Sequence, residues 1–85
     1  MKFNVRYFAS VREALGAGEP VELNVQACTL AELRDRLIAR GGRHAEVLAR
    51  GRALRAAVNQ VMATDESVAL ADGAEVAFFP PVTGG

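Results

Sequence analysis

The feature that most constrains the fold is a single amphipathic helix signal set between segments that alternate apolar and polar residues. Thr29 and Glu32 have the spacing of a capping box, in which each side chain satisfies a backbone donor at a helix start. The apolar residues that follow at helical intervals form one stripe, made of Leu30, Leu33, Leu37 and Ile38. Gly41 and Gly42 then stop the helix. A helix with one such stripe buries it against a sheet.

Four segments with the two-residue period of strands surround this helix. They are residues 2–8, 21–25, 55–62 and 75–79. The first two favour an antiparallel pair, and their connection, with a turn at 16–18, is longer than a tight hairpin. A shorter helical turn is expected over 44–49. The order β-β-α-β-β predicts an α+β fold, with one main helix across a mixed four- to five-stranded sheet.

Composition is that of one ordinary globular domain. The 85 residues allow a single modest core, and a chain that is 51% hydrophobic and 24% charged is not expected to be disordered. No apolar run approaches the roughly 20 residues that span a bilayer, and no signal-peptide core follows Met1. The single cysteine, Cys28, excludes an internal disulfide and fits a reducing compartment. We therefore expect a cytoplasmic protein with no membrane contact and no bound metal.

Positive charge gathers in the middle of the chain, although the formal net charge is zero. Seven of the nine arginines lie between Arg34 and Arg55, a window with only two acidic residues, Asp35 and Glu46. A nucleic-acid surface would interleave such arginines with aromatic residues, but all five aromatic residues lie near the two ends. We interpret the arginines, Arg34 included, as a solvated helical surface without a nucleic-acid partner.

Two residues with reactive side chains receive structural interpretations. Cys28 precedes the predicted helix, a position that lowers a thiol pKa, but a small buried or half-buried residue is the simpler interpretation. His44 is the only histidine and has no nucleophile or carboxylate near it in the sequence, so we interpret it as a helix-surface residue. Because no catalytic triad or metal cluster is visible, we do not expect an autonomous enzyme.

The closing stretch AFFPPVTGG is the strongest functional signal. If Phe78 faces the helix, Phe79 faces outward, and the alternation of the first strand turns Phe8 outward as well. Two outward phenylalanines favour a protein-binding surface, and the alternative is a second small cluster under a loop. Pro80 and Pro81 cannot donate to a strand ladder, so they end the strand and stiffen the chain that follows.

The last residues form an arm with little side-chain bulk. They are Val82, Thr83, Gly84 and Gly85. From residue 80 the arm spans about 20 Å when extended, and glycine lets a backbone enter a channel too narrow for side chains. The carboxylate of Gly85 is the one reactive group such an arm delivers. We therefore divide the chain into a domain, 1–79, and a tail, 80–85.

A carboxylate is a poor electrophile, so its use requires activation by a separate ATP-dependent enzyme, for example as an acyl adenylate. Attack by sulfur on that adenylate gives a thiocarboxylate, whose sulfur anion is a nucleophile. A diglycine end alone is a weak signal for this chemistry. Preceded by the Phe-Phe-Pro-Pro-Val run, it becomes a strong one.

Three segments resemble those of the small subunit of molybdopterin synthase, a ubiquitin-like β-grasp sulfur carrier. They are YFASVRE (7–13), AAVNQ (56–60) and DGAEVAFFPPVTGG (72–85). The resemblance implies that Gly85 is adenylated by an E1-like enzyme, takes sulfur from a sulfur donor protein and passes it to cyclic pyranopterin monophosphate. It also implies that Phe8, Met62 and Phe79 contact the large synthase subunit while 80–85 threads into it. The implied complex is a heterotetramer, the carrier binds no cofactor, and each dithiolene consumes two loaded carriers.

Two other functions stay open at this point. A β-grasp sulfur carrier for thiamine or cysteine synthesis shares the diglycine but is not expected to share the sequence of 79–82. A ubiquitin-like protein modifier would instead join its terminal carboxylate to lysines through amide bonds. The arginine-rich middle distinguishes none of these functions.

Overall fold

The computed structural model describes residues 1–81 and arranges them as a five-stranded mixed sheet with three helices. The strands are β1 (Lys2–Tyr7), β2 (Gly18–Glu22), β3 (Arg55–Val58), β4 (Val61–Met62) and β5 (Glu75–Phe79). The helices are α1 (Ala9–Leu15), α2 (Leu30–Ile38) and α3 (Gly42–Leu48). The strand order is β2-β1-β5-β3-β4, in which β1 and β5 are parallel and the other neighbours antiparallel. The predicted α+β fold with a mixed sheet is confirmed.

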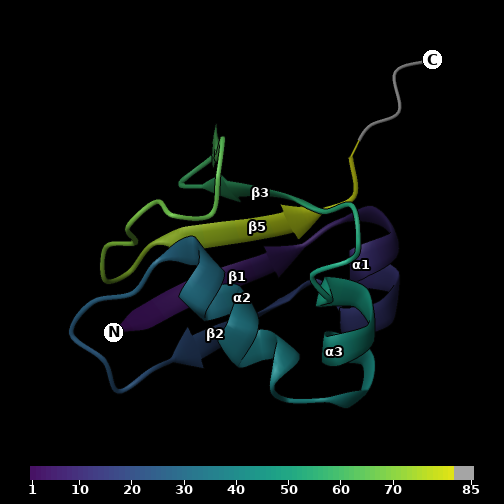
Figure 1. The fold of residues 1–85 in the computed structure, drawn as a ribbon, viewed down its shortest axis with the longest axis horizontal. Helices are drawn as coiled ribbons and strands as arrows, with labels where there is room; N and C mark the ends of the chain where they lie inside the picture. Colours follow the sequence, from purple (N-terminus) through teal and green to yellow (C-terminus); the bar gives the residue numbers. More distant parts are fainter. Residues whose placement is uncertain (82–85) are drawn as a thin grey trace.

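The core lies between the sheet and α2, which crosses one face of the sheet (Figure 1). Along β1 the side chains of Phe3, Val5 and Tyr7 are almost completely buried, and they alternate with exposed residues. In Figure 1, α1 and α3 lie at the end of the sheet to which β1 and β5 point. Each fully buried large apolar side chain contributes roughly 1.5 to 3 kcal/mol, so this one cluster holds the fold together.

The capping box and the leucine stripe of α2 are present as the sequence predicts. The backbone N–H of Glu32 donates to the Thr29 hydroxyl at 3.2 Å, and the N–H of Thr29 donates to the Glu32 carboxylate at 2.9 Å. The three leucines of the stripe are fully buried, whereas Ile38 is only partly buried against the core. The predicted second helical turn is also confirmed, as α3, which begins at Gly42 rather than at His44.

Helix α1 occupies the connection between the first two strands, where no helix is predicted. It packs Val11 into the core beside α3 and β5. Its sequence offers one local signal, the four-residue spacing of Val11 and Leu15, which places both on the same helix face. A helix of seven residues is marginal by itself, so its stability comes from this tertiary contact.

Strand β2 begins and ends three residues before the predicted segment 21–25. Pairing with β1 sets its register: Val21 lies opposite Phe3 and Glu19 opposite Val5. The remaining alternation of the predicted segment belongs to the following loop, in which Leu23 and Val25 still pack against the core. The prediction is wrong here because apolar alternation continues past the last ladder hydrogen bonds.

The predicted single strand over 55–62 is a hairpin made of β3 and β4. Asn59 and Gln60 both have positive φ angles, 49° and 68°, which is the conformation of a type I′ two-residue turn. The turn pairs Val58 with Val61 and Ala57 with Met62. An Asn-Gly pair would have predicted this turn, but the residue after Asn59 is glutamine. The last strand, β5, has the predicted bounds.

Candidate functional site

The outer face of the sheet, opposite α2, carries a floor of small side chains. In register across four strands stand Arg6 of β1, Ala77 of β5, Ala57 of β3 and Met62 of β4. Because side chains alternate along strands, this row points away from the core that holds Tyr7, Phe78 and Ala56. The two alanines in the middle of the row leave the centre of the face low.

Bulky apolar residues stand around this floor. Phe8 follows β1 in an extended conformation with 40% of its surface exposed, Met62 is 54% exposed, and Phe79 is half-buried at the end of β5. Phe8, Phe79 and Pro80 line a hollow of about 560 Å³ whose floor is Ala57 and Ala77. We call this feature the apolar hollow. The sequence predicted that Phe8 and Phe79 face outward, whereas it gave no sign of the alanine floor.

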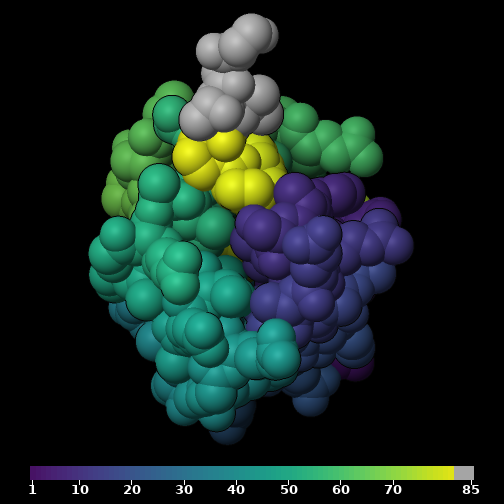
Figure 2. Space-filling model, turned by 90° about the vertical axis from the view of Figure 1, so that its right-hand side faces the viewer, coloured from purple at the N-terminus to yellow at the C-terminus, as the bar shows by residue number. Residues whose placement is uncertain are grey.

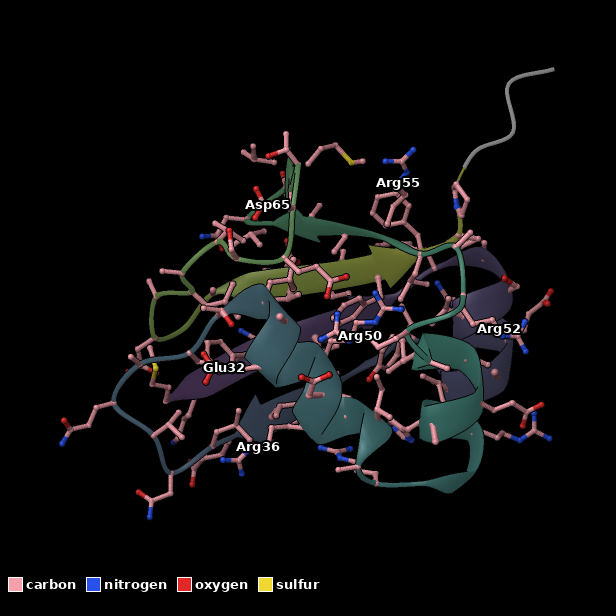
Figure 3. The ribbon with its side chains drawn as sticks, viewed as in Figure 1. Glu32, Arg36, Arg50, Arg52, Arg55 and Asp65 are labelled. Atoms are coloured by element: carbon pink, nitrogen blue, oxygen red, sulfur yellow. The ribbon has the colours of Figure 1, made fainter. Side chains whose placement is uncertain are left out.

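Charged groups form part of the rim of the apolar hollow. The guanidinium carbon of Arg6 lies 5.8 Å from the centroid of the Phe8 ring, within range of a cation–π contact. One Arg6 nitrogen is also 3.4 Å from a carboxylate oxygen of Glu75. Arg55 is exposed at the start of β3, directly across the ladder from Phe79, and Figure 3 shows it close to the end of β5. Arg6 and Glu75 therefore line the apolar hollow, and Arg55 stands next to it, across the ladder from Phe79.

The chain leaves the domain beside this hollow. Strand β5 ends at Phe79, as the two prolines after it require, and Pro80 and Pro81 are half-buried. Figure 2 shows these last described residues, in yellow, at the surface against the purple N-terminal segment. The predicted roles of Val82, Thr83, Gly84 and Gly85 lie outside the described residues 1–81.

His44 is not the solvated surface residue that its sequence context suggests. Its Nε2 is 2.8 Å from the Glu19 carboxylate, its ring meets Tyr7 edge-on, and its side chain is only 23% exposed. The hydroxyl of Tyr7 donates to the same carboxylate at 2.8 Å, and Arg40 also pairs with it. This cluster fastens α3 and the end of α2 to β1 and β2, on the core side of the sheet away from the apolar hollow.

The partners of Glu19 determine how it ionises. Burial by itself raises the pKa of this carboxyl group, but the hydrogen bonds from His44, Tyr7 and Arg40 outweigh burial and lower the pKa to about 2. The pKa of Tyr7 is raised because the phenol is buried and because its hydroxyl donates to the Glu19 carboxylate. Glu19 is therefore a structural anion, and Tyr7 stays protonated.

The interpretation of Arg34 as a solvated residue is wrong. Its side chain is 5% exposed and donates to the carbonyls of Leu48 and Ala49, at 2.8 and 2.7 Å, and to Glu66 at 2.5 Å. Arg50, labelled in Figure 3 beside α2, pairs with Asp35 and Glu66 and donates to a backbone carbonyl of α2. Part of the arginine-rich middle therefore forms ion pairs and hydrogen bonds that connect α2, the end of α3 and the segment before β5.

Cys28 is buried, with 4% of its surface exposed, as the structural interpretation predicts. Burial, with a smaller contribution from Glu32, raises the pKa of its thiol, so the reactive thiolate is disfavoured. Among residues 1–81, no three side chains of the metal-ligating types gather at one place. None of the described helices is long and apolar enough to cross a bilayer.

Fold and surface together define a class of protein: a ubiquitin-like β-grasp domain whose strand β5 passes an exposed apolar hollow. A family model described as the ThiS family matches residues 5–85, so the chain belongs to the ThiS family. That match includes the closing residues and all of the sheet except the first three residues of β1.

Individual relatives narrow this assignment. The molybdopterin synthase sulfur carrier subunit of Escherichia coli (strain K12) is 44% identical over 81 residues, which cover 95% of this chain and 96% of that protein. The subunit of the same name from Haemophilus influenzae is 40% identical over 82 residues, 96% of this chain and 98% of that one. The family resemblance seen in the sequence is confirmed.

A solved structure of a relative includes a second subunit. It is described as a protein-protein complex of subunits 1 and 2 of the molybdopterin-converting factor from Helicobacter pylori 26695. The matched chain is 27% identical, covers all of this chain and all of itself, and superposes with a TM-score of 0.69. The β-grasp fold is therefore shared with a protein that has been seen in a two-subunit assembly.

Proposed function

We propose that this chain is the sulfur carrier subunit of a molybdopterin synthase. One observation carries the proposal: an exposed apolar hollow lies where β5 passes into a Pro-Pro-Val-Thr-Gly-Gly end. A docking face at the root of a slender arm is what a carrier needs, because the face holds the partner while the arm delivers its end. The two relatives named as sulfur carrier subunits, 40% and 44% identical over nearly their whole length, support the same function.

The chemistry begins at the carboxylate of Gly85. An E1-like enzyme adenylates it with ATP and releases pyrophosphate, and sulfur from a sulfur donor protein then displaces AMP to leave a thiocarboxylate. The sulfur anion forms a C–S bond with cyclic pyranopterin monophosphate as a C–O bond of that molecule breaks and its oxygen leaves. One water then hydrolyses the resulting thioester, which leaves the sulfur on the pterin and restores the Gly85 carboxylate. Cys28 takes no part, because its thiol is buried and its pKa is raised. The carrier is not an enzyme in isolation, binds no cofactor itself and works in the cytoplasm.

Docking depends on the apolar residues of the outer face. Phe8, Met62 and Phe79 contact the large subunit, and residues 80–85 thread toward its active site with Gly84 in the narrowest part. Burial of exposed aromatic side chains of this kind is a usual source of binding energy at protein interfaces. Because a dithiolene has two sulfurs, two loaded carriers are consumed per product. The proposed assembly is a heterotetramer, and the two-subunit structure of the Helicobacter pylori relative supports a large-subunit partner.

Intact-mass spectrometry tests the loading step. Incubated with its activating enzyme, ATP and a sulfur source, the chain gains the mass difference between one sulfur and one oxygen, and a variant without Gly85 gains nothing while keeping its circular dichroism spectrum. Adducts on lysines of other proteins, without a thiocarboxylate, would instead identify a protein modifier.

Reconstitution tests the pathway. Loaded carrier, large subunit and pterin precursor are combined, and formation of the dithiolene is followed. We expect Phe79→Asp to lower product formation by weakening subunit association. The matched control is Arg43→Asp, at an exposed residue of α3, which should leave product formation near wild type. A loaded carrier that yields no dithiolene in this mixture, yet supplies sulfur to a thiamine or cysteine pathway, would refute the proposal.

A further inference from the structure

The apolar hollow has a shape and a charge pattern that specify more about its partner than apolarity alone. Its floor is two alanines, Ala57 and Ala77, in the centre of the sheet, and the bulkier residues Phe8, Phe79 and Pro80 also line this hollow of about 560 Å³. A surface with a depression of this kind excludes water only if the partner supplies a protruding group, because an unfilled void loses the contacts of the atoms that line it.

The hollow and its immediate surroundings carry a surplus of positive charge, because Arg6 and Glu75 line it and Arg55 stands beside it. Arg6 lies over the Phe8 ring, and one of its guanidinium nitrogens is 3.4 Å from the carboxylate of Glu75. Arg55 is exposed on the other side of Phe79. Arginine is well suited to such a border, since its stem covers apolar surface while its guanidinium forms charge-assisted hydrogen bonds with carboxylates. A partner with carboxylates around its protruding group complements this rim.

The edges of the sheet offer little alternative for docking. At the β2 edge, the N–H of Tyr7 donates to the Ala17 carbonyl and the N–H of Leu23 donates to the Met1 carbonyl. Because these bonds alternate along the ladder, the backbone of Pro20 points away from β1, and proline has no N–H to give to an added strand. On the other edge, β4 is only two residues long. Strand addition is therefore poorly supported at both edges, and the face is the surface available for docking.

We propose that the apolar hollow receives one bulky apolar side chain of the large subunit, and that Arg6 and Arg55 pair with carboxylates beside that side chain. This inference rests on the proposed function, since it takes the large subunit as the occupant. The arginines then act mainly on the rate of association, because charges at an interface rim steer encounter, whereas the filled hollow acts on the rate of dissociation.

Binding kinetics of the full-length chain with the large subunit of the same organism test this, measured across a range of salt concentrations. We expect wild-type association to slow as salt rises. The double variant Arg6→Gln, Arg55→Gln associates on the order of tenfold more slowly at low salt and loses most of the salt dependence. Ala77→Leu, which fills the hollow from its floor, speeds dissociation by on the order of tenfold or more. Arg36→Glu, on α2 and far from Arg55 in Figure 3, is the charge control and leaves both rates near wild type.

The outcomes separate this inference from the proposed function. Wild-type binding and dithiolene formation, together with unchanged kinetics in the arginine and Ala77→Leu variants, would overturn the inference and leave the function standing. Absence of both binding and dithiolene formation with the wild type would overturn the function, and the inference with it. Circular dichroism of each variant establishes that it is folded before its kinetics are compared.

Discussion

Replacing Arg34 with methionine is expected to destabilise the domain more than the same replacement of any other arginine in its arginine-rich middle. Methionine keeps much of the buried stem but removes the guanidinium and the three hydrogen bonds that it donates. The carbonyls of Leu48 and Ala49 then lose their partners at the end of α3, and Glu66 loses one of its two arginines. Removing one member of a buried ion pair costs about 3 to 5 kcal/mol. Because Glu66 is 29% exposed and keeps Arg50, we expect the lower end, about 3 kcal/mol.

That loss is large for a chain of this size. At roughly 0.05 to 0.15 kcal/mol per residue, the free energy of unfolding of such a domain is about 4 to 13 kcal/mol. A loss of about 3 kcal/mol lowers Tm by about 12 to 24 °C, since small domains lose roughly 4 to 8 °C per kcal/mol. Urea unfolding followed by circular dichroism measures the change directly. The variant is compared with Arg36→Met, an exposed change on the same helix that should stay within about 0.5 kcal/mol of wild type.

Glu66→Gln separates the ion pair from the carbonyl contacts. It removes the charge but leaves an amide oxygen that still accepts from Arg34, so a loss of about 1 to 2 kcal/mol is expected. If Arg34→Met lowered the free energy of unfolding by less than about 1 kcal/mol with an unchanged denaturant slope, the contacts of Arg34 would not be a main support of the fold. The same result would show that the two carbonyls find water readily.

Three further changes test other parts of the structure. Gly18→Ala brings a Cβ within 2.4 Å of the Val5 carbonyl oxygen, so β1 and β2 must separate there, and urea unfolding should show a loss of about 2 kcal/mol or more. Glu19 has its pKa lowered from 4.5 to about 2, so its ionised form stabilises the fold fully above pH about 4.5 and that contribution disappears as pH falls toward 2. The stability gap between wild type and Glu19→Gln should therefore narrow across that window, and a gap independent of pH would contradict the assignment. Gln60→Gly relieves a positive φ in the β3–β4 turn, so the free energy of unfolding should rise by about 0.5 kcal/mol and Tm should rise slightly. A lower free energy of unfolding would argue against the type I′ turn.

The elements that the sequence predicted correctly are those specified by neighbouring residues. The capping box of Thr29 and Glu32 marks the start of α2 within a span of four residues, and the alternation of Phe3, Val5 and Tyr7 defines β1 without reference to the rest of the chain. Both patterns agree with the tertiary structure because the side chains that pack the core are also the ones that set the local period.

Prediction was wrong where tertiary contact decides the local structure. Helix α1 is too short for helix propensity to predict it, and it is stable because Val11 packs into the core. The turn at Asn59 and Gln60 lacks the glycine that usually identifies a type I′ turn, so two short strands resembled one long strand. Tertiary packing of Val11 and the pairing of β3 with β4, rather than a local sequence pattern, fixed these boundaries.

The candidate site was predictable in its direction but not in its shape. Alternation alone placed Phe8 and Phe79 on the outer face, since each follows a buried neighbour. The alanine floor needs the register of β3 against β5, which no local pattern supplies. The partners of the buried polar groups are equally non-local: Arg34 meets Glu66 from 32 positions away, and His44 meets Glu19 from 25 positions away.

In the proposed function, sulfur leaves the domain from the carboxyl end of the chain, and a labelling experiment follows that transfer. The carrier is loaded with isotopically labelled sulfur as its thiocarboxylate, mixed with the large subunit and cyclic pyranopterin monophosphate, and both products are analysed by mass spectrometry. We expect the label to pass into the dithiolene, with two carriers returned to the free carboxylate for each product. Label that stays on the carrier while dithiolene forms from another sulfur source would contradict the proposed function.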